Sequence, residues 1–585
     1  MKKLTHIIMF SALSSSMFFS CTEDFLDKPA YSALSDEVLA DEKGVNTLLI
    51  GAYAALDGIG IGDPWAAQPS NWVYGDITGG DAHKGSEASD QSLINSIANF
   101  NSSPSNEYFN TKWKALYEGV TRANSVLELL ELVEGIPETE RANLTGQARF
   151  LRGHYYFELK KMFNMVPWID EATEDVNVSN ETDIWPNIQA DFQFAYDNLP
   201  QTQAEVARAN KWASGAYLGK TLLYQEKYQE AREIFTEVIG SGITSNGLKY
   251  GLVDNFHWNF NAATENNAES VFAIQMVAND GTNTIANSNQ GLMLSYPYPN
   301  SPFKCCGFYA PSQDLVNSFR IDATTGLPYL DNYNANPVEN DMGILSNQAF
   351  TPDDQFLDPR LDWTVGRRDI PYHDWGYYPG YDWIRDQAYG GPYAPKKHIY
   401  WQEHASEFSD QSDWGPGSAI NVMIIRFADV LLMAAEAEAQ IGNFSQALEY
   451  VNQVRERMAN NSEYWLRDYI NPDEPTVGFS SELAANYHIS PYPEGFLTSI
   501  EQAMKVIMFE RRVELAMEGH RYFDLVRWGV AQEVLNDYLQ YESQITTDIR
   551  GATFNQNDRY FPIPQRQIDL STTSEGPVLQ QNPGY

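Results

Sequence analysis

The sequence predicts an all-α, mainly helical protein in which a large loop-rich insert carries a few short strands. Three observations lead to this prediction: apolar residues at helical spacing, two matched helical hairpins, and a central stretch without helical periodicity. We expect the helical scaffold to occupy residues 41–250 and 420–540 and the insert to occupy residues 251–419. A C-terminal segment follows at residues 541–585.

Apolar residues recur at three- and four-residue steps in two stretches of the first half. One stretch runs from Trp113 to Leu127 and the other from Leu144 to Phe163. This spacing places the side chains on one face of a helix, where they can pack against a neighbouring helix. Asn164, with a proline soon after it, predicts the end of the second helix.

Two segments look like copies of one helical hairpin. In the first, Gly219 precedes Ala231 by twelve residues, and in the second, Ala435 precedes Ala447 by the same interval. Small residues at facing positions allow two antiparallel helices to approach closely, while larger neighbours fill the groove of the next hairpin. The pattern is that of a degenerate tetratricopeptide repeat with few copies.

The central insert is rich in Gly, Pro, Asn, Asp and aromatic residues. Within it, the run from Val271 to Met276 predicts a short strand. A loop-dense insert of this length between repeat helices usually carries function.

The first residues have the composition of a secretory signal. Two lysines precede an apolar run that is too short to cross a bilayer as a helix, so we expect residues 1–20 to be a cleaved signal peptide. A cysteine directly after the cleavage point is typical of a bacterial lipoprotein, which predicts lipidation of Cys21 and a tether over residues 21–40. The alternative is an ordinary signal with Cys21 as a bystander, because Phe18 and Phe19 stand where a leucine and a small residue are usual.

Cysteine content and net charge exclude some classes of protein. Besides Cys21 there are two cysteines, Cys305 and Cys306, and adjacent cysteines do not easily reach normal disulfide geometry, so we expect no disulfide framework. The formal net charge is -39. A field of that sign repels phosphate backbones, which argues against a nucleic-acid partner and against a surface that rests on anionic lipid.

Several enzyme motifs nearly occur and then fail. Residues 214–221 resemble a phosphate-binding loop, but the two glycines are one residue too close and the segment lies in a helical stripe. No histidine pair has zinc-ligand spacing, and there is no Gly-x-Ser-x-Gly elbow. We therefore expect a protein that is not an enzyme and has no cofactor or catalytic metal. Structural calcium in the Asp- and Asn-rich loops stays open, as does a glycosidase, whose carboxylate pair has no fixed spacing.

Four further segments carry a family resemblance, namely residues 147–157 (QARFLRGHYYF), 266–272 (NNAESVF), 510–529 (ERRVELAMEGHRYFDLVRWG), and the ending at 561–564 (FPIP) with 581–585 (QNPGY). In this order they resemble the signature helix, central strand, C-terminal helix pair and ending of the SusD/RagB family of outer-membrane nutrient-binding lipoproteins. Together with Cys21, the matches span nearly the whole chain.

This resemblance implies one domain over residues 41–585, with a tetratricopeptide-like scaffold and a loop-rich ligand face. It also implies a role: lipid-anchored on the external face of the outer membrane, the protein captures an oligosaccharide and delivers it to a SusC-like TonB-dependent transporter. We interpret Arg511, Arg512 and Glu514 as structural, because charged residues at helical spacing around apolar rings usually fix helix packing.

A glycan site needs exposed flat rings for stacking and a few planar polar groups. Two loop regions have this composition, residues 65–84 and residues 296–298 with 373–385. The candidate ligand contacts are Trp65, Trp72, Tyr74, Asp81, Lys84, Tyr296, Tyr298, Trp375, Tyr378, Trp383 and Arg385. For each ring the competing interpretation is that it is buried and anchors its loop.

The same sequence features also fit other functions. The basic pairs at 367–368 and 396–397 either bind uronate or sulfate groups or balance local charge. The same rings and polar loops suit capture of a peptide as well as a glycan. A lipid-anchored glycoside hydrolase and a tetratricopeptide adaptor with only protein partners are the further alternatives.

Overall fold

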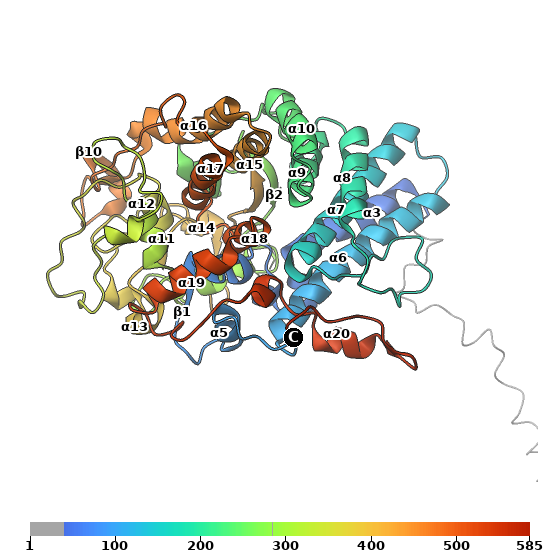
Figure 1. Ribbon diagram of the computed structural model, residues 1–585, viewed down its shortest axis with the longest axis horizontal. Coiled ribbons are helices and arrows are strands. Elements are labelled where there is room, and N and C mark those ends of the chain that lie inside the picture. The colour runs from blue at the N-terminus through green and yellow to red at the C-terminus, as the bar shows by residue number, and fades with distance from the viewer. Residues whose placement is uncertain (1–39, 283–284) are drawn as a thin grey trace, which may run out of the picture.

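The computed structural model describes residues 40–282 and 285–585, so the signal peptide, Cys21 and most of the tether lie outside the described residues. The described chain is mainly helical, and its strands form small two-stranded sheets, as the sequence predicts. Long helices gather at the right and top of Figure 1, while short elements and long loops make up the left-hand side. Over the described ranges, no helix combines the length and apolar character needed to span a membrane.

Six long helices build the first part of the scaffold and pack largely in chain order, α6 on α7, α7 on α8, α8 on α9 and α9 on α10. Their bounds are Glu42–Ala54 (α3), Glu107–Leu132 (α6), Glu138–Phe163 (α7), Trp185–Asn198 (α8), Lys211–Tyr224 (α9) and Tyr228–Ser241 (α10). The two predicted apolar stripes lie in α6 and α7. As predicted, α7 ends at Asn164, whose positive φ of 56° breaks the helix. Lys160 Nζ donates to the Asn164 carbonyl oxygen at 2.9 Å and satisfies one of the free acceptors at that end.

The two predicted hairpins are α9–α10 and the pair α15 (Phe427–Gln440) and α16 (Phe444–Asn460), and α15 also packs on α10. A Cβ atom at Gly219 would lie 2.5 Å from the Phe235 ring of the facing helix. Ala435 and Ala447 are fully buried in the second hairpin. The small residues therefore stand where the helices approach most closely, which confirms the hairpin prediction. Helix α17 (Ile500–Glu514) packs on α15 and α16.

One two-stranded sheet closes the loop-rich insert. Strand β2 (Ser270–Ile274) near its beginning pairs antiparallel with β8 (Val422–Arg426), which leads directly into α15. The predicted strand is thus confirmed, and its partner comes from the other end of the insert. The chain leaves the helical scaffold and returns to it at nearly the same place.

The elements inside and around the insert are short. A second sheet, β1 (Ala82–Gly85) with β3 (Phe308–Pro311), brings the first predicted loop region beside the second. The remaining short elements are α4 (Pro64–Ala67), α5 (Leu93–Ala98), α11 (Gln313–Ser318), α12 (Leu361–Thr364), β4 (Val365–Gly366), α13 (Gln387–Gly390), β5 (Ala394–Pro395), α14 (Ala405–Phe408), β6 (Ser409–Asp410), β7 (Gly417–Ser418), β9 (Arg467–Tyr469), β10 (Phe479–Leu483), α18 (Arg521–Arg527), α19 (Ala531–Glu542), α20 (Gln565–Leu570), β11 (Thr572–Thr573) and β12 (Gly576–Pro577).

A network of buried ion pairs ties the insert to α17. Glu514 accepts hydrogen bonds from Arg457 at 2.5 Å, Arg426 at 2.6 Å and Arg360 at 2.9 Å, and all four side chains are almost completely buried. The three arginines hold the pKa of Glu514 well below its usual value, so its carboxylate stays charged. Arg511 and Arg512 likewise form buried pairs with aspartates. The structural interpretation of this motif is confirmed.

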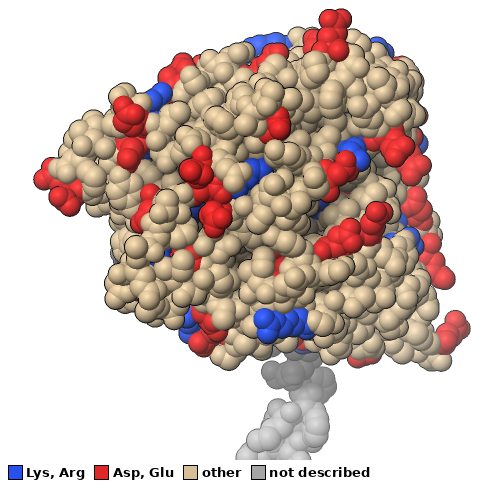
Figure 2. Space-filling view, turned by 60° about the vertical axis from the view of Figure 1, so that its left-hand side comes forward, with Lys and Arg blue, Asp and Glu red and all other residues tan. Residues whose placement is uncertain are grey.

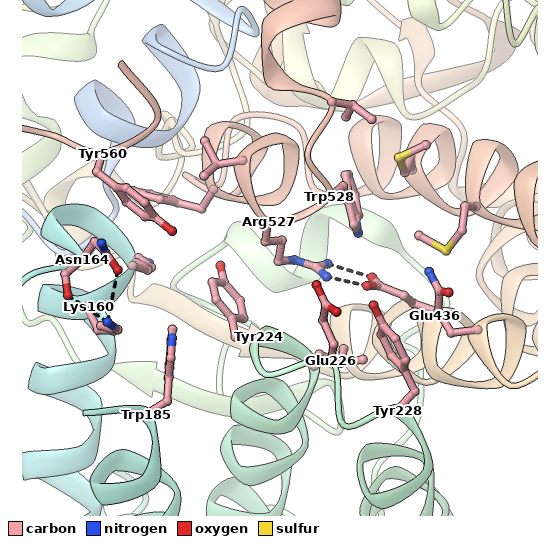
Figure 3. Close-up of a pocket in the computed structure, with 18 of the residues that line it drawn as sticks. Lys160, Asn164, Trp185, Tyr224, Glu226, Tyr228, Glu436, Arg527, Trp528 and Tyr560 are labelled. Atoms are coloured by element: carbon pink, nitrogen blue, oxygen red, sulfur yellow. Dashed lines mark hydrogen bonds and ion pairs between the residues drawn. The ribbon is translucent and has the colours of Figure 1, made fainter. Parts of the chain in front are cut away.

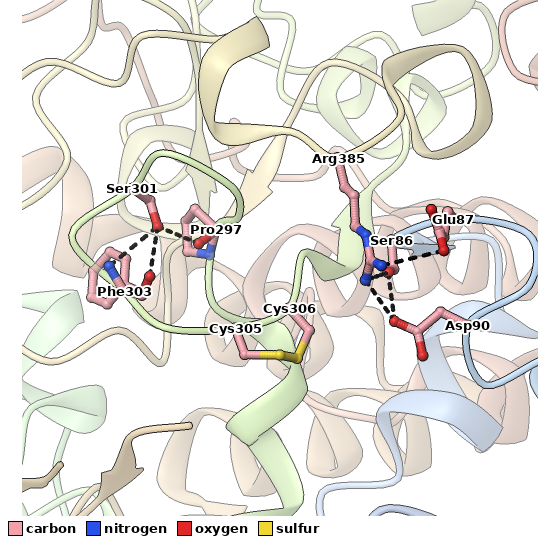
Figure 4. Close-up of a disulfide and its surroundings, with 9 residues drawn as sticks. All are labelled: Ser86, Glu87, Asp90, Pro297, Ser301, Phe303, Cys305, Cys306 and Arg385. Atoms are coloured by element: carbon pink, nitrogen blue, oxygen red, sulfur yellow. Dashed lines mark hydrogen bonds and ion pairs between the residues drawn. A yellow bond between two sulfur atoms is a disulfide. The ribbon is translucent and has the colours of Figure 1, made fainter. Parts of the chain in front are cut away.

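The two adjacent cysteines, for which normal disulfide geometry is difficult to reach, are joined by a disulfide (Figure 4). Cys305 and Cys306 follow one another in the chain, so the bond constrains a single loop and links no separate elements. Because stabilisation by a disulfide grows with the length of the loop that it closes, this bond contributes little to the stability of the whole fold. A core of buried side chains that runs from Val45 to Leu579 holds the fold together.

Candidate functional site

Most of the first predicted loop region faces inward. Trp72 and Tyr74 are completely buried, and each anchors its loop by a hydrogen bond to a carbonyl oxygen, of Gly291 at 3.0 Å and of Ala66 at 2.7 Å. Asp81 is buried and accepts from Arg512 Nε at 3.0 Å. These three side chains have no surface to offer a ligand, which corrects the sequence-based selection.

Lys84 and Trp65 complete that region. Lys84 Nζ donates to the carbonyl oxygens of Glu87 and Asp90 at 2.7 and 2.5 Å, and burial lowers its pKa to about 8. Its ammonium group therefore closes a turn and does not face outward. Trp65 is partly exposed and lies edge-on to Trp414, with ring centroids 5.8 Å apart, so this pair forms a ring platform at the surface.

In the second region, two tyrosines are buried and four side chains are partly exposed. Tyr296 and Tyr378 belong to a small apolar cluster beneath the loops, which corrects their selection as contacts. The four partly exposed side chains are Tyr298, Trp375, Trp383 and Arg385. Trp375 packs on Phe303 at 4.8 Å between centroids and donates its indole N–H to the Tyr400 carbonyl at 2.8 Å, so it anchors its loop as well.

Arg385 joins the two predicted regions. Its guanidinium donates to Asp90 at 2.7 Å and to Ser86 Oγ at 3.0 Å (Figure 4). It also lies 5.7 Å from the centre of the Tyr298 ring. These contacts place Ser86 and Asp90, just after the first predicted region, beside Arg385 of the second. Because the Arg385 guanidinium already donates to groups of the protein, few of its N–H groups are free to bind a ligand.

The two basic pairs are buried and engaged. Arg367 forms an ion pair with Asp362 at 2.7 Å, and Lys397 forms one with Glu518 at 2.8 Å. Lys396 Nζ donates to two carbonyl oxygens, and Arg368 donates to carbonyl oxygens of the 344–348 loop. Their position favours the interpretation as local charge balance over recognition of uronate or sulfate.

A ring-lined recess of about 260 Å³ lies at the surface between the insert and the loop that connects α16 to α17. Its lining is rich in aromatic side chains with a polar rim: Asn255, His257, Trp258, Asn261, Trp363, Trp401, Glu403, Glu463, Tyr464, Trp465, Leu466, Arg467 and Phe479. On the side where the loop-rich part comes forward, acidic groups are scattered over a largely uncharged surface (Figure 2).

Stacked rings form the base of this recess. His257 stacks on Trp363 with centroids 5.0 Å apart, and His373 stacks on Trp401 at 4.9 Å. Trp401 donates its indole N–H to His257 Nε2 at 2.9 Å, so that nitrogen is an acceptor. Burial lowers the pKa of His257 to about 3, so the base of the recess is uncharged at neutral pH.

Partly exposed rings and two carboxylates form the walls. Trp258 and Tyr464 face each other at 5.3 Å between centroids and 60° between planes. Glu403 and Glu463 are exposed at the rim. The backbone N–H of Glu403 donates to Asp374 at 2.8 Å, so the second predicted loop supports the recess from behind. Flat rings beside carboxylate oxygens can stack on the C–H face of a sugar and accept hydrogen bonds from its hydroxyls.

The sequence-based selection missed the residues of this recess. Trp258 and Trp401 lie in the predicted insert but outside the two segments chosen in it. Tyr464 and Phe479 lie in a stretch assigned to the helical scaffold, although residues 461–497 contain Pro, Gly and Asn and lack helical periodicity. That loss of periodicity was the available signal. Over the described ranges, no group of three His, Cys, Asp or Glu side chains is arranged to hold a metal ion.

The chain is similar to known proteins over most of its length. A family model described as "SusD family" matches residues 268–585, and one described as "Starch-binding associating with outer membrane" matches residues 24–223. The SusD-like protein P25 of Formosa agariphila is 25% identical over the full length of both chains. A SusD superfamily protein from Bacteroides vulgatus has a TM-score of 0.64 and 22% identity, with 94% of this chain and 100% of that chain covered. Surface glycan-binding protein A from Bacteroides thetaiotaomicron, in complex with laminarihexaose, has a TM-score of 0.62 and 19% identity over 93% and 99% of the two chains.

Proposed function

This chain belongs to the SusD family, and from that premise we propose that it is a cell-surface glycan-binding lipoprotein of the outer membrane. In this proposal Cys21 carries the lipid anchor, and the loop-rich side captures an oligosaccharide from the medium. The protein then delivers the oligosaccharide to a SusC-like TonB-dependent transporter. The description of the second family model, which names starch binding and association with the outer membrane, supports the localisation.

The ring-lined recess is the observation that supports glycan capture. Trp258, Tyr464 and Phe479 are partly exposed, whereas most large rings of the chain are buried in the core. Leaving such rings at the surface forgoes their hydrophobic burial, which amounts to about 2 kcal/mol for a large side chain. A ligand whose apolar face covers these rings recovers that free energy. Sugar rings have such faces and carry hydroxyls that match the polar rim.

Relatives that bind glycans support a role without catalysis. The structural neighbour in complex with laminarihexaose is named as a surface glycan-binding protein. We propose the same class of ligand for this chain and leave the linkage and the sugar to experiment. Peptide capture by the same recess and hydrolysis of a bound glycan are the alternatives that the binding test must separate.

The test is a titration of the chain from residue 22 with neutral oligosaccharides, including laminarihexaose and maltoheptaose, and with a peptide mixture. We expect an oligosaccharide to bind and Trp258→Ala to weaken that binding about 10-fold or more. Phe356→Ala is the control, because this exposed ring lies outside the recess. Weakening by Trp65→Ala and not by Trp258→Ala would move the site to the Trp65–Trp414 platform. Binding of peptides alone, or release of shorter sugars, would refute the proposal.

Delivery to a transporter needs a separate test. The proposed partnership rests on family membership, so it is examined in the organism's own membranes. Co-purification of the tagged, lipidated chain with a TonB-dependent β-barrel protein after detergent extraction is the expected result. Recovery of the chain without any barrel protein would count against delivery and would leave glycan capture untouched.

A further inference from the structure

A second and larger cavity lies among the ends of the scaffold helices. Its volume is about 460 Å³, within the range of small-molecule sites, and none of its lining residues belongs to the ring-lined recess. Figure 3 shows side chains that converge on this cavity, and its lining comes from the end of α7, the start of α8, the α9–α10 turn, α15, α17, and α18 with the residues after it. Its lining includes Trp185, Tyr224, Glu226, Tyr228, Glu436, Arg527 and Trp528.

Aromatic side chains surround an ion pair at the centre of this cavity. Trp185 and Tyr224 lie 5.3 Å apart between centroids, and the Arg527 guanidinium lies 4.7 Å from the Trp528 ring and 5.6 Å from the Tyr224 ring. Tyr228 is partly exposed at the edge of the cavity. The cavity therefore presents flat apolar surfaces around a polar centre (Figure 3).

The buried charges of the cavity are already matched. Arg527 donates to both oxygens of Glu436, at 2.5 and 2.8 Å, and its Nε donates to Asp524 at 2.8 Å. Lys161 forms an ion pair with Glu158 at 2.6 Å. A charged ligand would have to break such a pair and leave a buried charge uncompensated, which is costly. A neutral ligand avoids that cost and can still use the free lone pairs of the carboxylate.

The cavity contains a buried hydrogen-bond donor that has no acceptor among the described residues. This donor is the indole N–H of Trp528. In Figure 3 this nitrogen points toward the Arg527–Glu436 pair. A buried donor without an acceptor costs about 1–3 kcal/mol, and a ligand oxygen placed between the ring and the ion pair would remove that cost.

We propose that this cavity is a second binding site, which takes a neutral saccharide of one to three residues independently of the ring-lined recess. The sugar lies against Tyr228 and Trp185, and one of its hydroxyl oxygens accepts a hydrogen bond from the Trp528 N–H while the same hydroxyl donates one to the Glu436 carboxylate. The exposed Glu226 carboxylate accepts a further hydroxyl at the edge. Matched internal charge selects against uronates, sulfated sugars and charged peptides.

The experiment titrates the chain from residue 22 with maltotriose, cellotriose and laminaritriose at millimolar concentrations, observed by saturation-transfer NMR. The recess is first disabled by Trp258→Ala, so that any remaining binding reports the second cavity. In that background we expect one of the three sugars to bind. Tyr228→Ala should then weaken binding about 10-fold, and Trp528→Phe, which keeps a ring but removes the donor, should weaken it about 5-fold. Melting temperatures of all variants verify that the fold is intact.

The outcomes separate this site from the proposed function. Binding by the wild-type chain that Trp258→Ala abolishes would overturn the second site and leave the recess as the only one. Residual binding unchanged by both Tyr228→Ala and Trp528→Phe would also overturn it. Residual binding of trigalacturonate or of charged tripeptides in preference to the neutral sugars would refute the class of ligand. If no sugar binds the wild-type chain, both the second site and glycan capture fail.

Discussion

At the base of the ring-lined recess, the indole N–H of Trp401 donates a hydrogen bond to Nε2 of His257 at 2.9 Å. Because Nε2 accepts this bond, the neutral imidazole carries its proton on Nδ1. His257 is held on one side by Trp363 and lies 4.5 Å from the ring of His373. The base of the recess is thus a set of rings whose positions fix one another before any ligand arrives.

Burial of His257 predicts a loss of stability in acid. The folded state holds the pKa of this histidine at about 3, while the unfolded chain has the ordinary value of about 6.5. Between these values the unfolded state binds more protons, so the free energy of unfolding falls as pH falls. Between pH 6.5 and 4.5 the contribution amounts to roughly 2 kcal/mol, because the slope reaches its full value of about 1.4 kcal/mol per pH unit only below pH 6.5. Urea denaturation at the two pH values measures it.

His257→Gln provides the matched variant for this acid effect, since the amide oxygen can still accept from Trp401 and does not titrate. We expect the drop in unfolding free energy between the two pH values to be smaller in the variant than in the wild-type chain. Equal drops would show that His257 is accessible to protons in the folded protein.

Trp375→Ala should destabilise the loop region and not merely reduce ligand binding. The change removes packing on Phe303 and the hydrogen bond to the Tyr400 carbonyl. For a partly exposed tryptophan we expect a cost of about 2 kcal/mol, below the 3–5 kcal/mol of a fully buried one. Thermal unfolding measures it. Trp414→Ala is the control, because this ring is 46% exposed and should cost less than about 0.5 kcal/mol. Equal melting temperatures of wild type and Trp375→Ala would mean that this ring does not anchor its loop and is free to contact a ligand.

Glu514→Gln should be among the most damaging single substitutions. It neutralises the carboxylate between Arg360, Arg426 and Arg457, and breaking such a buried pair costs about 3–5 kcal/mol. The measurement is the midpoint of urea unfolding. Glu118→Gln, which removes an exposed pair with Arg122, is the comparison and should change stability by less than about 1 kcal/mol. A small effect at Glu514 would mean that water or relaxation compensates the three arginines.

Two glycines test the hairpin packing. Gly219→Ala places a Cβ 2.5 Å from the Phe235 ring, and overpacking of this kind costs about 1–3 kcal/mol. Gly240→Ala, in the partner helix α10, meets no atom within 4 Å and should stabilise by up to about 1 kcal/mol through helix propensity. Opposite shifts in melting temperature are expected. Shifts of the same sign would contradict the close approach of α9 and α10.

The helical hairpins could be predicted because their signal is local. The spacing of Gly219 and Ala231 lies within one pair of helices, and the structure places these residues at the contact. Burial of individual rings could not be predicted in the same way. Trp72 is covered by a segment that contains Gly291, more than two hundred residues along the chain, and nothing near Trp72 in the sequence signals that contact.

The candidate site was predicted in kind but not in position. A ring-lined surface among the loops was expected, and His373 and Asp374 of the second predicted region support one from behind. The exposed rings of the recess come from other segments, because the packing of segments that are distant in the sequence decides which loop is exposed at the surface. Trp258 faces Tyr464 only because the connection between α16 and α17 folds back over the insert.

The walls of the recess therefore come from two stretches of chain, near residues 258 and 464, that lie outside the long helices. The exposed rings of these stretches, Trp258 and Tyr464, face each other at the surface, so either ring can be exchanged without disturbing the contacts between scaffold helices. Exchange of these two rings would therefore change which ligands fit the recess while the helical scaffold stays the same. Diversity among its relatives should accordingly concentrate in these two stretches, and the buried helix faces should change slowly.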